Sequence, residues 1–203
     1  MGRVIIARHG NTFDAGDIVT RVGARTDLPL STSGMVQAEK LREHFSPESS
    51  DWNFVRAYCS PLRRTKETAD KILEAGHGAT TAEAVDFLTE IDYGIDENKA
   101  ESEVVKRLGK AALEAWDKTA VVPDGWKVNP KHLIESWKNF LPALTKEQGD
   151  TLIVTSNGIA RFALSAFPNP DAGFDIKLKT AAYGLVVMAK DDVTIESWNQ
   201  RTI

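Results

Sequence analysis

Short apolar runs alternate with longer amphipathic stretches along this chain, and the alternation predicts a sheet covered by helices. The runs at 4–7, 54–60, 84–90 and 151–155 are typical of short buried strands. The stretches between them repeat apolar residues at helical spacing. Strands that alternate with helices favour a mostly parallel sheet with helices on both faces. We therefore predict an α/β fold, built as a three-layer αβα sandwich.

The end of the chain departs from this alternation. Two apolar runs, 181–189 and 193–198, are separated only by Lys190, Asp191 and Asp192. So short a polar connection is typical of a tight hairpin turn between antiparallel strands. We expect this pair to form an antiparallel edge of the sheet.

Capping residues mark where the first two helices should begin. Ser31 or Thr32 would cap the first helix, because both side chains can accept a hydrogen bond from its first turn. Its inner face would consist of Met35, Ala38, Leu41 and Phe45. Ser60 would cap the second helix, with Pro61 at the first helical position. A later helix is expected from Gly158 onward.

Residues from about 100 to 147 read as a helical insertion. The segments 101–118 and 129–147 each predict one helix, and Asn129 with Pro130 would begin the second. The insertion also brings three tryptophans close together in sequence, and they would either pack in the core or form a hydrophobic wall over a pocket. They are Trp116, Trp126 and Trp137.

Composition narrows the class of protein. With 203 residues the chain suits a single domain over 1–203. The net charge of −4 argues against a nucleic-acid or anionic-membrane surface, so any bound anion must be held by local arginines. Cys59 stands alone, and neither a leader-like segment nor an apolar run long enough to span a bilayer is evident. We expect a cytoplasmic protein; the sequence leaves a homodimer open.

Residues with catalytic chemistry follow each predicted parallel strand. The carboxyl ends of such strands meet at one edge of the sheet, where ligands bind in α/β folds. The residues placed there are Arg8, His9, Arg64, Glu90, Asn157 and Gly158. Each alone has an ordinary structural explanation, such as Asn157 capping a helix. Their convergence at one edge favours a shared site.

Together these residue types suit a phosphoryl group. Arg8, Arg64 and the backbone N–H groups near Gly158 could bind its oxygens. A neutral His9 could attack phosphorus, and Glu90 could protonate the leaving oxygen and then activate water. The arginines balance the phosphate charge, so we expect neither a metal nor another cofactor. The chain also lacks HxH or CxxC ligand spacing and the P-loop pattern.

Four segments resemble, in order, the motifs of the histidine phosphatase superfamily, the phosphoglycerate-mutase-like proteins. "ARHGNT" is similar to R-H-G-[ED/N]-T, and "RTDLPLSTSG" to D-x-P-L-T-x-x-G. "SPLRRTKETA" is similar to S-P-L-x-R-x-x-x-T-A, and "LTEIDYG" to L-x-E-x-x-x-G. The resemblance spans nearly the whole chain. It implies hydrolysis of a small phosphorylated metabolite through a phosphohistidine.

The resemblance also implies a role for individual residues. His9 would be the phosphorylated nucleophile, Arg8 and Arg64 would clamp the phosphoryl oxygens, and Glu90 would be the general acid and base. Asn11 would bind or orient the phosphate region. Three further arginines remain without a firm role: Arg63 would lie on the surface, and Arg21 and Arg25 would either contact a distal part of the substrate or be solvated.

One departure from the family pattern leaves the activity open. The last motif is usually S-H-G, whereas this chain has Ser156, Asn157 and Gly158. Asparagine can donate to a phosphoryl oxygen, but it carries neither a positive charge nor a transferable proton. Losing a donor to a developing oxyanion costs about 3–4 kcal/mol, and the retained amide should reduce that loss. Of the other histidines, only His132 could plausibly replace the missing one.

Three functions follow from these observations. The leading interpretation is a phosphomonoesterase that acts through phospho-His9. A phosphoglycerate-type mutase would use the same chemistry, but family mutases generally carry longer insertions than this chain does. A phospho-ligand binding protein with weak catalysis is the third reading, because of Asn157.

Overall fold

The computed structural model describes residues 2–144, 149–169, 173–189 and 192–202. Its centre is a six-stranded sheet of order β3-β2-β4-β1-β5-β6. The strands are β1 (Gly2–Arg8), β2 (Phe54–Cys59), β3 (Glu83–Ala84), β4 (Asp150–Thr155), β5 (Ala182–Ala189) and β6 (Asp192–Arg201). The first four pair in parallel, whereas β5 pairs antiparallel with both β1 and β6. The predicted mostly parallel sheet with an antiparallel edge is confirmed; residues 190 and 191 of the predicted turn lie outside the described residues.

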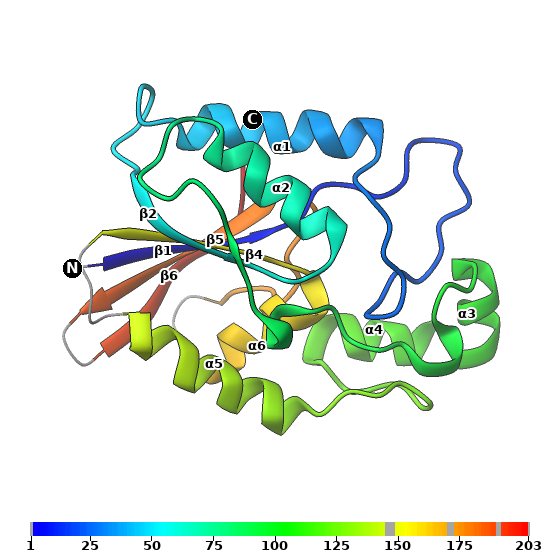
Figure 1. Ribbon diagram of the computed structural model, residues 1–203. Helices are drawn as coiled ribbons and strands as arrows, with labels where there is room; N and C mark the ends of the chain where they lie inside the picture. The colour runs from blue at the N-terminus through cyan, green and yellow to red at the C-terminus, as the bar shows by residue number, and fades with distance from the viewer. Residues whose placement is uncertain (1, 145–148, 170–172, 190–191, 203) are drawn as a thin grey trace.

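Helices cover both faces of the sheet, which confirms the α/β fold (Figure 1). On one face lie α1 (Thr32–Phe45) and α2 (Arg63–Leu73), and on the other lie α5 (Pro130–Leu144) and α6 (Asn157–Ala166). The short helices α3 (Glu101–Leu108) and α4 (Lys110–Thr119) lie beyond one end of the sheet. Every helix in the described segments is too short or too polar to cross a membrane.

The central strand β1 is buried on both faces. Val4 and Ile6 belong to the core beneath α5 and α6, whereas Ile5 and Ala7 belong to the core beneath α1 and α2. This follows from the two-residue repeat of a strand, which turns successive side chains to opposite faces. A continuous apolar run is therefore what a strand between two helical layers requires.

The prediction of a strand over 84–90 is wrong. Only Glu83–Ala84 pairs with β2, and Asp86–Leu88 forms a turn of 3₁₀ helix. Here the chain leaves the sheet edge and turns inward, so that Leu88 is fully buried and its carbonyl accepts from Thr155 Oγ1 at 2.7 Å. This inward turn carries Glu90 toward the carboxyl end of β4.

Two predicted helix boundaries also differ. The single helix expected over 101–118 is two helices, because Gly109 adopts a φ of 80°, which interrupts the helix between α3 and α4. The second helix begins at Arg63 rather than Pro61, since Ser60 Oγ accepts from Leu62 N at 3.2 Å in a turn that precedes it. The prediction that α6 starts at Gly158 is one residue late.

The inner face of α1 is the predicted one at Ala38, Leu41 and Phe45 and differs at its first position. Ser31 caps the helix by accepting from Gly34 N, as expected. Gly34 is buried whereas Met35 is exposed, so the prediction for Met35 is wrong. A methyl group on Gly34 would lie 2.1 Å from Asn11 O, and one on Gly10 would lie 2.5 Å from Gly34 O. Two glycines thus let the loop after β1 rest directly on the helix.

The insertion packs into the core. Asn129 Oδ1 accepts from His132 N at 3.1 Å, which confirms it as the cap of α5; the predicted end of that helix, 145–147, lies outside the described residues. The three tryptophans belong to the core cluster under α5 and α6. Their burial favours the core interpretation over a wall of the pocket.

Candidate active site

The carboxyl ends of the parallel strands bring distant segments together. We call this side of the sheet its carboxyl edge. Arg8 pairs with Thr155 across β1 and β4, and His9 N donates to Thr155 O at 3.1 Å. Ser60 N donates to Val154 O at 3.3 Å, which joins the end of β2 to the same edge. This edge faces the loop 10–30 and helices α3 and α4 (Figure 1).

His9 is buried and neutral at this edge. Its Nδ1 lies 2.7 Å from Gly10 O, and because a carbonyl only accepts, Nδ1 carries the proton. Nε2 therefore keeps its lone pair. Burial, followed by the charges of Arg64 and Arg8, holds the pKa of His9 well below its ordinary value. A neutral imidazole with a free Nε2 has the protonation state that a nucleophile needs.

We expect this low pKa to be visible in a titration. At pH values between the pKa of His9 in the folded protein and the ordinary value of 6.5, His9 binds a proton in the unfolded chain but not in the folded protein. The free energy of unfolding should therefore fall, by at most about 1.4 kcal/mol per pH unit from this group, as pH drops below that value. Proton NMR of the protein and of His9→Asn identifies the resonance, whose midpoint should lie below 6.5. A midpoint at or above that value contradicts the prediction.

The charges of two arginines, Arg64 and Arg8, act on His9. Arg64 is fully buried at the start of α2, and its Nη1 and Nη2 donate to Thr26 O and Gly23 O. Arg8 is half-buried and donates from Nη1 to Leu178 O at 2.9 Å. The Nε group of each arginine is buried without a hydrogen-bond partner among the described residues. Each guanidinium group therefore has one N–H, at Nε, that pairs with no other described residue.

Glu90 is held against the start of α6. Its Oε1 accepts from Ile91 N at 2.9 Å, and its Oε2 accepts from Gly158 N at 3.4 Å. A methyl group on Gly158 would lie 2.1 Å from Glu90 Oε1, so only glycine permits this approach. The Gly158 amide therefore donates to Glu90, whereas we expected it to be free for a phosphoryl oxygen.

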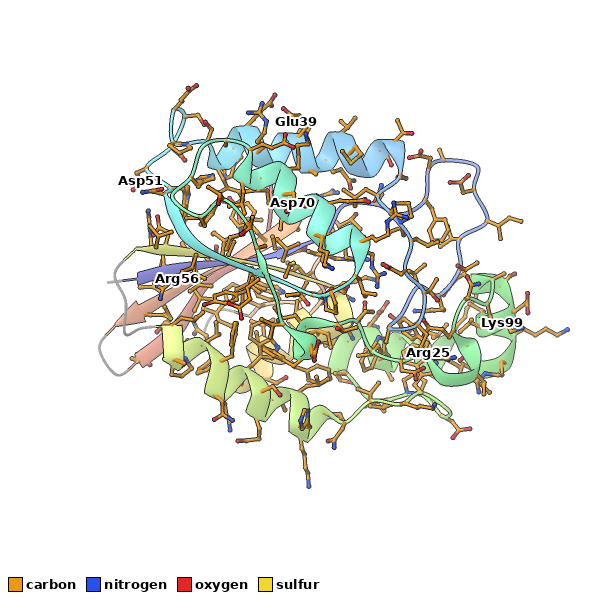
Figure 2. All side chains as sticks on the ribbon, in the orientation of Figure 1. Arg25, Glu39, Asp51, Arg56, Asp70 and Lys99 are labelled. Atoms are coloured by element: carbon orange, nitrogen blue, oxygen red, sulfur yellow. The ribbon has the colours of Figure 1, made fainter. Side chains whose placement is uncertain are left out.

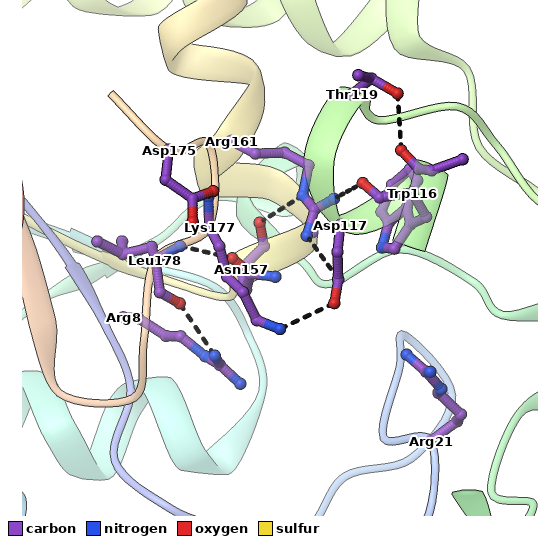
Figure 3. A network of polar contacts seen from close by, with 12 residues as sticks. Arg8, Arg21, Trp116, Asp117, Thr119, Asn157, Arg161, Asp175, Lys177 and Leu178 are labelled. Atoms are coloured by element: carbon purple, nitrogen blue, oxygen red, sulfur yellow. Dashed lines mark hydrogen bonds and ion pairs between the residues drawn. The ribbon is translucent and has the colours of Figure 1, made fainter. Parts of the chain in front are cut away.

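Asn157 links α6 to Arg8. It is the first residue of α6, and its Oδ1 accepts from Leu178 N at 2.8 Å. The carbonyl of Leu178 in turn accepts from Arg8, as Figure 3 shows. Asn157 thus holds Leu178, whose carbonyl in turn accepts from Arg8.

The structure adds two residues that the sequence interpretation missed, Arg161 and Tyr93. Arg161 follows Asn157 by one helical turn, is fully buried over the Trp116 ring, and donates from Nε to Asn157 O. Its charge acts on Arg8 and Tyr93, and burial next to Glu90 raises the pKa of Tyr93. The signal for Arg161 that the sequence offers is its position four residues after Asn157.

A cavity of about 290 Å³ opens beside His9. Its lining is Arg8, His9, Asn11, Thr12, Phe13, Val19, Thr20, Val22 and Thr180. Asn11 lies there as predicted, with its Nδ2 donating to Ser33 Oγ at 3.2 Å. Among the described residues, no group of three or more His, Cys, Asp or Glu side chains is arranged to hold a metal ion.

The other histidines do not line this cavity. His132 is exposed at the start of α5, so the structure gives no support to the expectation that it replaces the missing imidazole. His44 contacts Tyr183 Oη and His77 accepts from Phe54 N. Arg63 is exposed and pairs with Glu67, as expected of a surface residue.

Comparisons with known proteins agree with this arrangement. The model of the histidine phosphatase superfamily (branch 1) matches residues 4–201. No curated protein sequence gives a significant match. Solved structures that share the fold do so at low sequence identity, so they bear on architecture alone.

The first of these structures is a mycobacterial glucosyl-3-phosphoglycerate phosphatase, with a TM-score of 0.78, 18% identity and coverage of 98% of this chain and 99% of that one. Phosphoserine phosphatase from Entamoeba histolytica, in complex with 3-phosphoglyceric acid, has a TM-score of 0.71 and 18% identity, and 98% of each chain is covered. Phosphoglycerate mutase from Bacillus anthracis has a TM-score of 0.75 and 21% identity, with coverage of 97% and 92%. Because the family model spans nearly the entire sequence, this chain belongs to branch 1 of the histidine phosphatase superfamily.

Proposed function

We propose that this protein hydrolyses a small phosphomonoester through a covalent phospho-His9. The observation that carries the proposal is the neutral, buried His9 with a free Nε2, on which the charges of two arginines, Arg64 and Arg8, act. Two guanidinium charges match the charge of one phosphoryl dianion. The arrangement needs no metal to balance that charge.

The first step transfers the phosphoryl group to the protein. Nε2 of His9 attacks phosphorus, the N–P bond forms, and the ester P–O bond breaks. Protonated Glu90 gives its proton to the leaving oxygen. Arg8 and Arg64 bind the phosphoryl oxygens, and we expect the amide of Asn157 to donate to one of them.

The second step releases phosphate. Glu90, now ionised, takes a proton from water while the water oxygen attacks phosphorus and the N–P bond breaks. Inorganic phosphate leaves, and both His9 and Glu90 return to their initial states. Transfer to a second hydroxyl instead of water would make the same site a mutase.

Two arguments favour hydrolysis over the mutase reaction. Family mutases generally have longer insertions, whereas here the insertion is short and packs into the core. The similar structures include phosphatases that act on small phosphorylated metabolites, although they also include a mutase. Hydrolysis is therefore the reaction we assign.

The product and the adduct together test the assignment. During turnover of a phosphomonoester, mass spectrometry after an alkaline quench should find a phosphoryl group on the peptide that contains His9. Incubation with 3-phosphoglycerate and a bisphosphoglycerate primer should yield inorganic phosphate rather than 2-phosphoglycerate. Appearance of 2-phosphoglycerate would establish the mutase, and turnover without any adduct on His9 would refute the mechanism.

A second candidate function is a phospho-ligand binding protein with weak catalysis. The specific observation in its favour is Asn157, which replaces the usual histidine and uses its Oδ1 to hold Leu178. Tight phosphate binding without release of phosphate from any phosphomonoester would favour this candidate over the hydrolase.

A further inference from the structure

We propose that the phosphomonoester bound here has a leaving group without anionic charge, such as a neutral alcohol, and that carboxylated or bisphosphorylated substrates bind poorly. The inference rests on the proposed function, because it assigns the His9 cavity to the substrate. It goes further by naming the chemical class of the group that occupies the rest of that cavity.

Among the described residues that line the cavity, the sole cation is Arg8, at its phosphoryl end. Apart from Arg8 and His9, the residues that line it are neutral: Asn11, Thr12, Phe13, Val19, Thr20, Val22 and Thr180. Arg8 and the neighbouring Arg64 are matched by one phosphoryl dianion. A carboxylate or second phosphate on the leaving group would lose water without gaining a charged partner, which is unfavourable.

The two arginines of the loop that borders the cavity are already paired. Arg21 binds Glu101 at 2.5 Å and lies over the rings of Tyr93 and Trp126. Arg25 donates to Asp92 and to Gly94 O, at the α3–α4 end of the molecule (Figure 2). Neither side chain belongs to the cavity lining, so neither is placed to bind a distal anion.

The cations behind Asn157 pair with one carboxylate on α4. Asp117 Oδ2 accepts from Lys177 Nζ at 2.8 Å, and its Oδ1 lies 3.9 Å from Arg161 Nη2 (Figure 3). Arg161 also donates from Nη1 to Trp116 O and from Nε to Asn157 O. The carboxylate balances one of these two positive charges, and neither Arg161 nor Lys177 belongs to the cavity lining.

Apolar side chains line part of the cavity, beside the neutral polar ones. Phe13, Val19 and Val22 line it, and Val19 is 51% exposed beside Ile18, which is 77% exposed. Lys40 and Arg201 line a separate hollow that shares only Thr180 with this cavity. A neutral leaving group with an apolar portion matches this lining, because its burial removes these side chains from water.

A matched pair of substrates tests the inference. Glycerol 3-phosphate and 3-phosphoglycerate have nearly the same shape, but the second has a carboxylate where the first has a hydroxymethyl group. We expect kcat/KM for phosphate release to be about tenfold or more higher for glycerol 3-phosphate, which corresponds to about 1.4 kcal/mol. Equal values, or a preference for 3-phosphoglycerate, would overturn the inference.

Binding to His9→Asn separates this inference from the hydrolase assignment. Isothermal titration calorimetry should show tighter binding of glycerol 3-phosphate, and that order supports the inference even when neither compound is hydrolysed by the wild-type protein. Absence of hydrolysis counts against the proposed function alone. Equal or tighter binding of 3-phosphoglycerate overturns the inference whatever the turnover.

A gain of charge provides the complementary test. Val19→Lys places an ammonium group at the cavity wall and should lower the preference for glycerol 3-phosphate about threefold, within the range of an exposed ion pair. Val36→Lys is the matched control, since Val36 is 55% exposed on α1 and does not line the cavity. An unchanged preference in Val19→Lys, or an equal change in both variants, would contradict the proposed role of the cavity wall.

Discussion

Replacing His9 with asparagine should lower kcat for phosphate release by about 10⁴-fold or more, while phosphate still binds. Loss of a covalent nucleophile removes the two-step route altogether, and changes of this size are typical of such losses. Asparagine is the suitable replacement because its Nδ2 can donate to Gly10 O in place of the imidazole Nδ1. Arg8 and Arg64 keep their own contacts with carbonyl groups, so the anion site itself should persist.

Steady-state phosphate release and calorimetric titration with inorganic phosphate measure the two parts of this expectation. His132→Asn is the matched control, since it removes an exposed imidazole outside the cavity and should leave both quantities unchanged. Turnover that survives in His9→Asn would mean that another group accepts the phosphoryl moiety. A loss of phosphate binding equal to the loss of turnover would mean that His9 is needed for the pocket rather than for the chemistry.

Local sequence was sufficient to predict the sheet and the residues at its edge. The run from Val4 to Ala7 is apolar at every position because β1 is covered by helices on both faces. Because β1 runs parallel to β4, the two strands end together at Arg8 and Thr155, and Asn157 follows two residues later. These relations depend on strand periodicity and direction, which a sequence pattern contains.

Contacts between distant segments explain what the pattern could not predict. Glu90 is positioned because Leu88 and Thr155 form a hydrogen bond across 67 residues, so the region 84–90 leaves the sheet despite its strand-like composition. Met35 has the helical spacing of a core residue, but Gly34 takes the buried place because a backbone loop packs there. Tertiary packing of this kind overrides a local preference.

The Asn157 substitution illustrates the same limit for the site. Its sequence position identified the missing imidazole, but not the bond from Leu178 N to Asn157 Oδ1 or the further bond that orients Arg8. The position of Arg161 could not be predicted from the sequence for a similar reason, because its burial over Trp116 depends on α4 packing against α6. Side-chain types favour a phosphoryl site, whereas only the fold shows which donors of its arginines already have partners.

Glu90→Gln should separate the two steps of the proposed reaction. With an alkyl phosphate, kcat should fall by about 10²- to 10⁴-fold, because the leaving oxygen no longer receives a proton. With p-nitrophenyl phosphate the leaving phenolate departs unprotonated, so the first step should proceed and the second, which needs a base, should stall. Stopped-flow absorbance should then show a burst of about one equivalent of nitrophenolate followed by slow turnover.

The control for this variant must remove a half-buried, hydrogen-bonded carboxylate without removing the proton donor. Glu97 suits that purpose, because it accepts from Gly23 N, Thr26 Oγ1 and Tyr93 N and so stabilises the loop beside Arg64. Glu97→Gln should lower the free energy of unfolding by about 1–3 kcal/mol. The reason is that the amide nitrogen of glutamine would face donors that now form hydrogen bonds to the carboxylate. It should produce no burst, because both proton transfers remain with Glu90. Two outcomes would contradict this role: a burst in Glu97→Gln, or equal losses with alkyl and nitrophenyl esters in Glu90→Gln. Either would mean that the effect of Glu90 on turnover arises from its bonds to Ile91 and Gly158 rather than from proton transfer.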